Sequence, residues 1–210
     1  MELQFNFKQK YVFFDTETEG TYLISSKPWQ LSWIVAQGKK IISKNDHYLK
    51  FDDLNVSPEA AKITGFSIAK YKSRAEDPKT VFDKFWKDIS EEGTIICGHN
   101  ILGFDVYILN TLMKLIGKKN DWSYITSCID TLALSRAYRI GLTSPDCDLL
   151  SWQYKLINFR KRGLKSSQGA MLKEFNIDFD KNRLHDALYD IEMNFLLFHE
   201  LIKKIDINVK

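Results

Sequence analysis

The sequence predicts a single α/β domain with a central mixed β-sheet flanked by α-helices. Three observations predict this fold class. The first quarter contains short β-branched and aromatic runs separated by tight turns, as is typical of an antiparallel meander. Apolar stripes with helical spacing then alternate with short apolar runs that suit buried strands. The 210 residues contain no internal repeat and no low-complexity linker, so we expect one domain over residues 1–210.

The strands are predicted from β-branched and aromatic composition. A buried strand is expected over Tyr11–Phe14, and a second over Gln30–Gln37 after an interruption at Gly20. Residues 38–40 suit a turn, and Ile41–Phe51 is expected to form one or two more strands. Two further short strands are expected over Thr94–Cys97 and Ser127–Asp130.

Helices are predicted where apolar residues recur every three or four positions. Ser57 and Pro58 suit the cap and first turn of a short helix that ends near Gly65. The stretch Ile140–Ser151 is rich in turn formers. The other expected helices are Pro78–Ile89, Ile101–Leu115, Thr131–Tyr138 and Leu184–Ile202.

Composition excludes several classes of protein. Hydrophobic residues make up 44% and charged residues 27%, which excludes a disordered chain, and a net charge of +3 does not by itself indicate nucleic-acid binding. No apolar run approaches the roughly 18–20 residues of a membrane span, and residues 1–10 lack the apolar core of a secretion signal. Cys97, Cys128 and Cys147 form no C-x-x-C pair. We therefore expect buried, reduced thiols in a cytoplasmic protein, without a disulfide framework or a cysteine-rich zinc site.

Two acidic residues stand at the end of the first predicted strand. Asp15 and Glu17 are two positions apart, so their side chains share one face of a strand. Two like charges about 4 Å apart cost roughly 4 kcal/mol at an effective dielectric constant near 20. A hard divalent cation removes that cost, because Mg²⁺ and Mn²⁺ prefer carboxylate oxygens. The alternative is a solvated turn in which both acids point into water.

Two later segments also carry acids next to buried stripes. Asp105 lies four residues after Ile101 and three before Ile108, so it falls on or beside the buried face and needs a cation or a donor. Asp190 borders the stripe of the last predicted helix, and His185 lies where that helix begins. An ordinary histidine pKa of about 6.5 suits proton abstraction from water near neutral pH. Alternatively, His185, Asp186 and Asp190 belong only to the N-terminal turn of that helix, where the two acids favour the helix dipole.

Together the three segments resemble the three exonuclease motifs of the DEDD superfamily of 3′–5′ exonucleases. The resemblance is to its His-containing branch, which includes the bacterial polymerase III epsilon subunit and ribonuclease T. The other branch carries Tyr four positions before the last Asp, whereas here that position is Asp186 and His185 stands five before. Val56–Gly65 and Ile129–Leu132 also resemble family segments. The matching motif residues are Phe14-Asp15-Thr16-Glu17-Thr18, then His99-Asn100 with Phe104-Asp105, then His185 with Ala187 and Asp190.

The resemblance implies an RNase H-like fold and a metal-dependent 3′–5′ exonuclease. Such an enzyme releases 5′-mononucleotides from the 3′ end of DNA, preferably single-stranded, in proofreading or repair, with a DNA polymerase as a candidate partner. It implies that His185 takes the proton from the attacking water. Two ions of Mg²⁺ or Mn²⁺ are expected on Asp15, Glu17, Asp105 and Asp190. The implied terminal-nucleotide pocket consists of Thr18, Ile63, Asn100 and Phe104.

Departures from the family pattern concern substrate preference. Glu19 replaces a common Thr, Thr64 stands where some relatives carry His, and Tyr138–Phe175 matches loosely. Within Ser151–Lys173 there is no acid, and basic residues alternate with aromatic ones, which suits either single-strand binding or a solvated basic face. The basic residues are Lys155, Arg160, Lys161, Arg162, Lys165 and Lys173, and the aromatic ones are Trp152, Tyr154 and Phe159.

Two other functions stay open from the sequence. The same chemistry could act on RNA 3′ ends, because this branch of the superfamily serves both substrates. A non-catalytic nucleic-acid-binding or polymerase-associated subunit is the third hypothesis. It has no need for four converging carboxylates, so the motifs favour an exonuclease.

Overall fold

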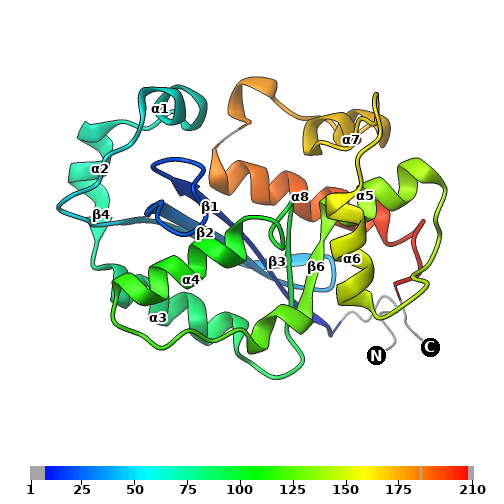
Figure 1. Cartoon of the computed structure of the whole chain (residues 1–210), viewed down its shortest axis with the longest axis horizontal. Helices are drawn as coiled ribbons and strands as arrows, with labels where there is room; N and C mark the ends of the chain where they lie inside the picture. The colour runs from blue at the N-terminus through cyan, green and yellow to red at the C-terminus, as the bar shows by residue number, and fades with distance from the viewer. Residues whose placement is uncertain (1–7, 185, 208–210) are drawn as a thin grey trace.

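A computed structural model of the protein describes residues 8–184 and 186–207. It shows a six-stranded mixed β-sheet with helices on both of its faces (Figure 1). The strand order in the sheet is β4-β3-β2-β1-β5-β6. The strands are β1 (Lys10–Thr18), β2 (Pro28–Gln37), β3 (Lys40–Leu49), β4 (Ala75–Glu76), β5 (Ile95–Gly98) and β6 (Cys128–Asp130).

The sheet combines an antiparallel meander with parallel strands. β1 pairs antiparallel with β2, and β2 pairs antiparallel with β3. On its other side β1 pairs parallel with β5, which pairs parallel with β6. The expected meander and the expected mixed sheet are therefore confirmed, and β1 lies inside the sheet with a neighbour on each side.

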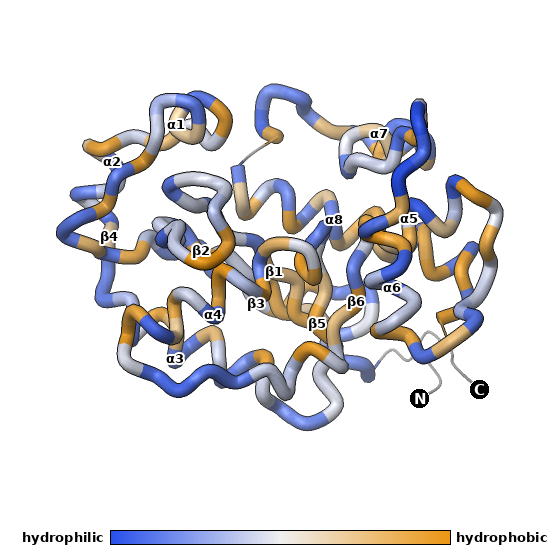
Figure 2. Tube along the Cα trace, viewed as in Figure 1, coloured by the Kyte–Doolittle hydropathy of each residue, from blue (hydrophilic) through white to orange (hydrophobic). Residues whose placement is uncertain are grey.

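The helices cover both faces of the sheet. Because side chains alternate along a strand, Phe13 of β1 packs on the rings of Phe195 and Phe198, while Phe14 packs on Phe85. These contacts place α8 (Ala187–Leu201) on one face and α3 (Pro78–Ile89) on the other, and Figure 2 shows the hydrophobic centre between them. The helices are α1 (Pro58–Thr64), α2 (Ile68–Arg74), α3 (Pro78–Ile89), α4 (Asp105–Leu115), α5 (Thr131–Ile140), α6 (Leu149–Asn158), α7 (Gln168–Glu174) and α8 (Ala187–Leu201).

Two predicted helices begin later than expected. α4 starts at Asp105 and not at Ile101, because Asn100 adopts a left-handed backbone with φ of 67° and begins a turn. α8 starts at Ala187, because the Asp186 side chain accepts the backbone N–H of Tyr189 and caps the helix there. The predicted inclusion of residues 101–104 in α4, and of Leu184 and Asp186 in α8, was wrong. Leu115 was predicted to lie within the helix that became α4, as its last apolar residue, but it is 45% exposed, so its predicted burial was also wrong.

No element was predicted from the sequence at α2, β4, α6 or α7. Asp148 caps α6 by accepting the backbone N–H of Ser151, and Trp152 in this helix is only 2% exposed. Trp152 therefore belongs to the core, and its predicted role beside a nucleic-acid base is wrong. Cys97 and Cys128 are buried free thiols as expected, whereas Cys147 is partly exposed. None of the helices within the described residues is long and apolar enough to span a membrane.

Candidate active site

The carboxyl end of β1 presents acids to one face of the sheet and a threonine to the other. Asp15 and Glu17 alternate in register with Phe13, so they lie on the face that α8 covers. Thr16 points to the opposite face, toward the start of α4. The predicted shared face of the two acids follows directly from this strand geometry.

Asp105 is fixed to β1 at the first turn of α4. Its carboxylate accepts hydrogen bonds from the backbone N–H of Thr16 at 3.0 Å and from the Thr16 hydroxyl at 2.6 Å. Asp105 is 2% exposed, which confirms its predicted place on a buried helix face. Both bonds go to Oδ1, so Thr16 orients this carboxylate and leaves its second oxygen for another partner.

Asp190 lies in the first turn of α8 beside a chain of polar side chains. The Gln168 side-chain amide donates to the Asp190 backbone carbonyl at 3.0 Å and approaches its carboxylate at 3.5 Å. The Asn194 amide donates to the Gln168 side-chain oxygen and to the Thr131 hydroxyl, at 3.0 and 2.6 Å. That hydroxyl also lies 3.0 Å from Nδ1 of His99. These bonds link α7, α8 and α5 around the acids.

The four carboxylates line one cavity of about 470 Å³. Burial, followed by the negative charges of the other three acids, raises the pKa of Asp15 well above its usual range. Burial and the neighbouring acids raise the pKa of Glu17 to about 8, and burial raises the pKa of Asp105 to about 7. The cavity is thus a desolvated place in which negative charges repel one another.

The donor chemistry of this cavity fits a hard divalent cation. Its acids offer carboxylate oxygens, and a cation would relieve the burial and repulsion that raise their pKa values. Among the described residues, no group of three or more His, Cys, Asp and Glu side chains is already arranged to hold a metal ion. The acids therefore line the cavity without closing on one point.

A second cavity of about 550 Å³ adjoins the first and shares Thr16, Glu17 and Phe104 with it. Thr18 and Ile63 line this second cavity, so three of the four residues predicted to bind the terminal nucleotide meet there. Asn100, the fourth, lines the carboxylate cavity. The Thr18 hydroxyl donates to the carbonyl of Gly20, which leaves its oxygen free to accept. His185 lies outside the described residues.

Several residues that shape the site had no predicted role. Asp130 is fully buried and accepts the backbone N–H groups of Asn100, Leu102 and Leu132, at 2.8, 3.0 and 2.9 Å. It therefore fixes the turn that carries Asn100. Its only sequence signal was the segment Ile129–Leu132. The sequence pattern did not single out Gln168 or Asn194, because the spacing of residues in a helix does not tell a buried side-chain amide from a solvent-exposed one.

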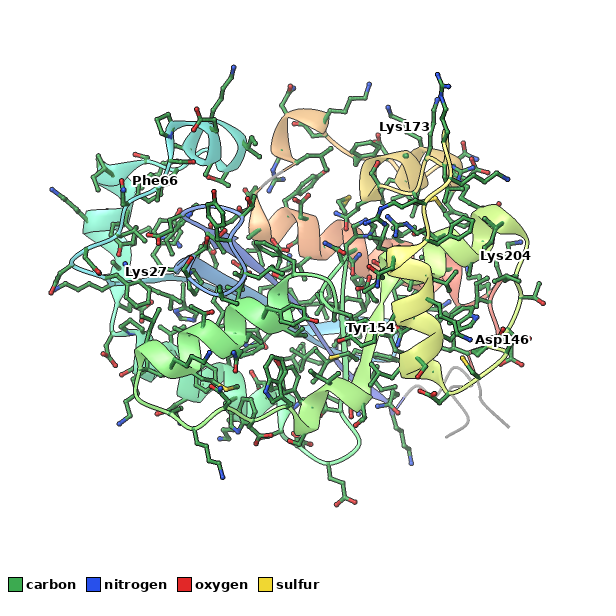
Figure 3. The ribbon with its side chains drawn as sticks, viewed as in Figure 1. Lys27, Phe66, Asp146, Tyr154, Lys173 and Lys204 are labelled. Carbon is green, nitrogen blue, oxygen red and sulfur yellow. The ribbon has the colours of Figure 1, made fainter. Side chains whose placement is uncertain are left out.

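The basic residues of Ser151–Lys173 extend over α6, α7 and their connection. Figure 3 shows Tyr154 on α6 and Lys173 on α7, and Figure 2 shows a hydrophilic connection between these helices. Residues 159–165 are exposed except for a partly buried Leu164. We call residues 159–165 the basic connection. It leads directly into residues 167–169, which line the carboxylate cavity.

The basic connection carries cations without acidic partners. Lys161, Arg162 and Lys165 form no ion pair with a described residue, and Arg160 donates to the carbonyl of Ile157 at 2.9 Å. Arg136 holds the end of α6, where the basic connection begins, because its guanidinium donates to the carbonyl groups of Leu156 and Ile157. Tyr154 is half-buried against the core, whereas Phe159 is 36% exposed.

The arrangement has counterparts among solved structures. Escherichia coli exonuclease I with zinc and single-stranded DNA gives a TM-score of 0.73 at 21% identity, covering 93% of this chain and 40% of that chain. The same protein with a dT13 oligonucleotide gives 0.74 at 19% identity, covering 94% and 42%. Its complex described as ExoI/SSB-Ct gives 0.72 at 20% identity, covering 93% and 41%. These similarities show the fold, which is RNase H-like as expected.

This chain spans about two fifths of the length of those solved chains. No curated protein matches the sequence. A family model described as RNase_T exonuclease matches residues 12–198, which include the carboxyl end of β1 and the start of α8. Because this match spans most of the sequence, the chain belongs to the RNase T family of exonucleases.

Proposed function

We propose that the protein is a metal-dependent exonuclease that shortens single-stranded DNA from its 3′ end and releases 5′-mononucleotides. The observation that carries the proposal is one cavity lined by four carboxylates from three separate segments of a chain in an exonuclease family. Oligonucleotide complexes of exonuclease I support DNA as the substrate. We extend the proposal to one exonuclease domain over residues 1–210.

Divalent cations are general in this family, and we propose Mg²⁺ or Mn²⁺ here. Two such ions, when bound, would supply an activated water and stabilise the charge on the phosphate and the leaving oxygen. The chain's own part is to hold desolvated carboxylates in place, as Thr16 does for Asp105. The proposed ligands are Asp15, Glu17, Asp105 and Asp190.

The terminal nucleotide would occupy the cavity that adjoins the carboxylates. Ile63 and Phe104 offer apolar surfaces to the base. Thr18 offers a hydroxyl oxygen that accepts a hydrogen bond, which suits the 3′-hydroxyl of the sugar. Asn100 lies on the carboxylate side, where its amide would meet the sugar or the scissile phosphate. These are the four residues of the predicted pocket, and their roles are proposed here.

The remainder of the strand would follow the basic connection. An anionic cavity repels a phosphate backbone, so strand binding needs cations at its rim. The basic connection supplies them next to residues 167–169 of the cavity wall. Phe159 offers an exposed ring on which a base can stack. We also propose action beside a DNA polymerase or a single-strand-binding protein, in the cytoplasm.

The test is incubation with 5′-labelled single-stranded DNA and RNA of one sequence, with Mg²⁺ or Mn²⁺. Stepwise shortening from the 3′ end is expected, faster on DNA, and absent in EDTA and in Asp15→Asn. Faster shortening of RNA would replace DNA by RNA as the substrate. No shortening of either, with binding intact, would favour a non-catalytic nucleic-acid-binding subunit.

His185 is proposed to take the proton from the attacking water. Only a neutral imidazole accepts a proton, so activity should rise with pH as His185 loses its proton. His185→Ala should lower kcat by about 100-fold and abolish that rise, with DNA affinity unchanged. A pH profile that keeps its shape in His185→Ala would remove this residue from the role.

A further inference from the structure

Helix α1 stands between two cavities and contributes no buried residue to the core. On one side lies the proposed terminal-nucleotide cavity. On the other side lies a third cavity of about 500 Å³, to which β2, β3, α2 and the turn before α8 contribute. Ile63 and Thr64 line both cavities, and Ile63 is 58% exposed. Helix α1 therefore separates the two cavities and adds little to the core.

The third cavity has an excess of positive charge. Its two acids are engaged, because Asp46 pairs with Arg74 at 2.7 Å and Asp186 lies 3.9 Å from Arg183. Asp46 also accepts from the side chains of Gln30 and Ser32, at 2.6 and 2.8 Å. The remaining two cations, Lys62 on α1 and Lys70 on α2, are exposed and make no ion pair with any described residue.

The same cavity has an aromatic wall. Tyr48 lies beside Trp29 in an edge-to-face contact, and the Arg74 guanidinium stacks over the Tyr48 ring at 4.3 Å. Uncompensated lysines next to aromatic and guanidinium planes are the chemistry that binds a phosphate backbone with its bases. The ligand class is therefore a nucleic-acid strand.

The shortened strand does not need this cavity. Its terminal nucleotide would occupy the cavity on the other side of α1, and its 5′-ward part would follow the basic connection. Figure 1 shows α1 and α2 at one side of the molecule and α7 at the other, with the end of β1 and the start of α8 between them. The third cavity lies between α1 and α2 on one side and the turn before α8 on the other, and it shares Leu184 with the carboxylate cavity. A second strand would diverge from the first there, next to the acids.

We propose that the third cavity binds the complementary strand at a duplex end, with α1 separating it from the strand that is shortened. This inference rests on the proposed function, since it assigns the shortened strand to the other side of α1. Lys62 and Lys70 would contact phosphates of the complementary strand. The protein would then act on frayed duplex ends as well as on single strands.

The experiment compares two labelled DNAs in EDTA by fluorescence anisotropy. One is a hairpin with a single blunt end, and the other is the single strand of its 3′ arm. Lys62→Ala/Lys70→Ala should weaken hairpin binding about tenfold and reduce its salt slope by about two, because each lost duplex phosphate contact lowers the slope by about 0.9. Single-strand affinity should stay within about twofold.

The matched control is Lys72→Ala/Lys79→Ala, which removes two exposed charges that line neither cavity. It should bind both DNAs as the wild type does. Equal losses on hairpin and single strand would assign the lysines to the shortened strand and overturn the inference. An unchanged hairpin affinity would also overturn it. If the wild type bound neither DNA, the proposed function itself would fail.

Discussion

The carboxylate cavity and the basic connection lie next to each other but are built in opposite ways. The cavity gathers acids from β1, α4 and α8 in a desolvated place, where burial and repulsion raise the pKa values of Asp15 and Glu17. The basic connection leaves Lys161, Arg162 and Lys165 exposed, and they need no protein partner there. Burying like charges costs stability, whereas exposed charges cost little.

This difference separates two tasks. Chemistry on a phosphodiester needs groups held in fixed positions away from water. Holding a strand needs positive charge along a path, which exposed side chains supply. Removing a cavity acid should therefore abolish activity and raise stability. Removing connection cations should weaken binding and leave stability alone.

The largest expected effect is that of Glu17→Gln. Loss of one proposed ligand should lower exonuclease activity by at least about 100-fold. At neutral pH the metal-free protein should gain about 1–2 kcal/mol in its free energy of unfolding, because Gln needs neither the proton that folding forces on Glu17 nor a buried charge. Activity assays and urea denaturation in EDTA measure the two effects. A lower free energy of unfolding in Glu17→Gln than in the wild type would contradict the view that repulsion among the acids destabilises the fold.

The second effect concerns His99, which the cavity keeps neutral. Burial, and then the charge of Arg136, lowers the pKa of His99 to about 4. As the pH falls, His99 therefore becomes protonated near pH 6.5 in the unfolded chain but only near pH 4 in the folded protein. Stability from this group is complete above pH 6.5 and is lost as the pH falls to 4, by up to about 3 kcal/mol.

His99→Gln keeps a hydrogen-bonding group beside Thr131 and removes the titration. The free energies of unfolding of the wild type and His99→Gln should converge or cross as the pH falls from 6.5 to 4. Denaturant curves at several pH values measure this difference. A constant difference across the range would show that His99 is not held neutral.

The third effect tests the basic connection. Changing Arg160, Lys161 and Arg162 together to Ala should weaken single-strand binding about tenfold and lower its salt slope by about two. The free energy of unfolding should stay within about 0.5 kcal/mol, since these side chains are exposed. Lys72, Lys79 and Lys87 changed to Ala serve as the control, with unchanged binding. If the variant at Arg160, Lys161 and Arg162 bound single-stranded DNA as tightly as the wild type, the basic connection would be a solvated basic face without a role in strand binding.

The smallest effect concerns how Thr16 orients Asp105. Thr16→Val keeps the strand and the backbone N–H bond at 3.0 Å but removes the hydroxyl bond at 2.6 Å. Activity should fall about fivefold, as expected for one hydrogen bond worth about 1 kcal/mol. Thr16→Ser should restore most of that loss. If the serine variant were as slow as the valine variant, the hydroxyl would not be the cause.

Local spacing predicted much of the fold and of the site. Asp15 and Glu17 share a face because side chains alternate along a strand, and Asp105 is buried because its helix places it beside Ile108. The cap at Ser57, with Pro58 and Gly65, also follows from short-range chemistry. These features depend on neighbours within a few residues, so the sequence alone determines them.

Tertiary structure decided what spacing could not. Asp130 holds the turn at Asn100 from another strand, and Trp152 is in the core although it belongs to a segment rich in basic residues. Gln168 and Asn194 meet beside Asp190 only because α7 packs on α8. Such contacts join residues distant in the chain, and their free energy arises when the helices pack on the sheet. The sequence thus determined which groups are proposed to carry the chemistry, and the packing of α1, α7 and α8 decided which cavities they share.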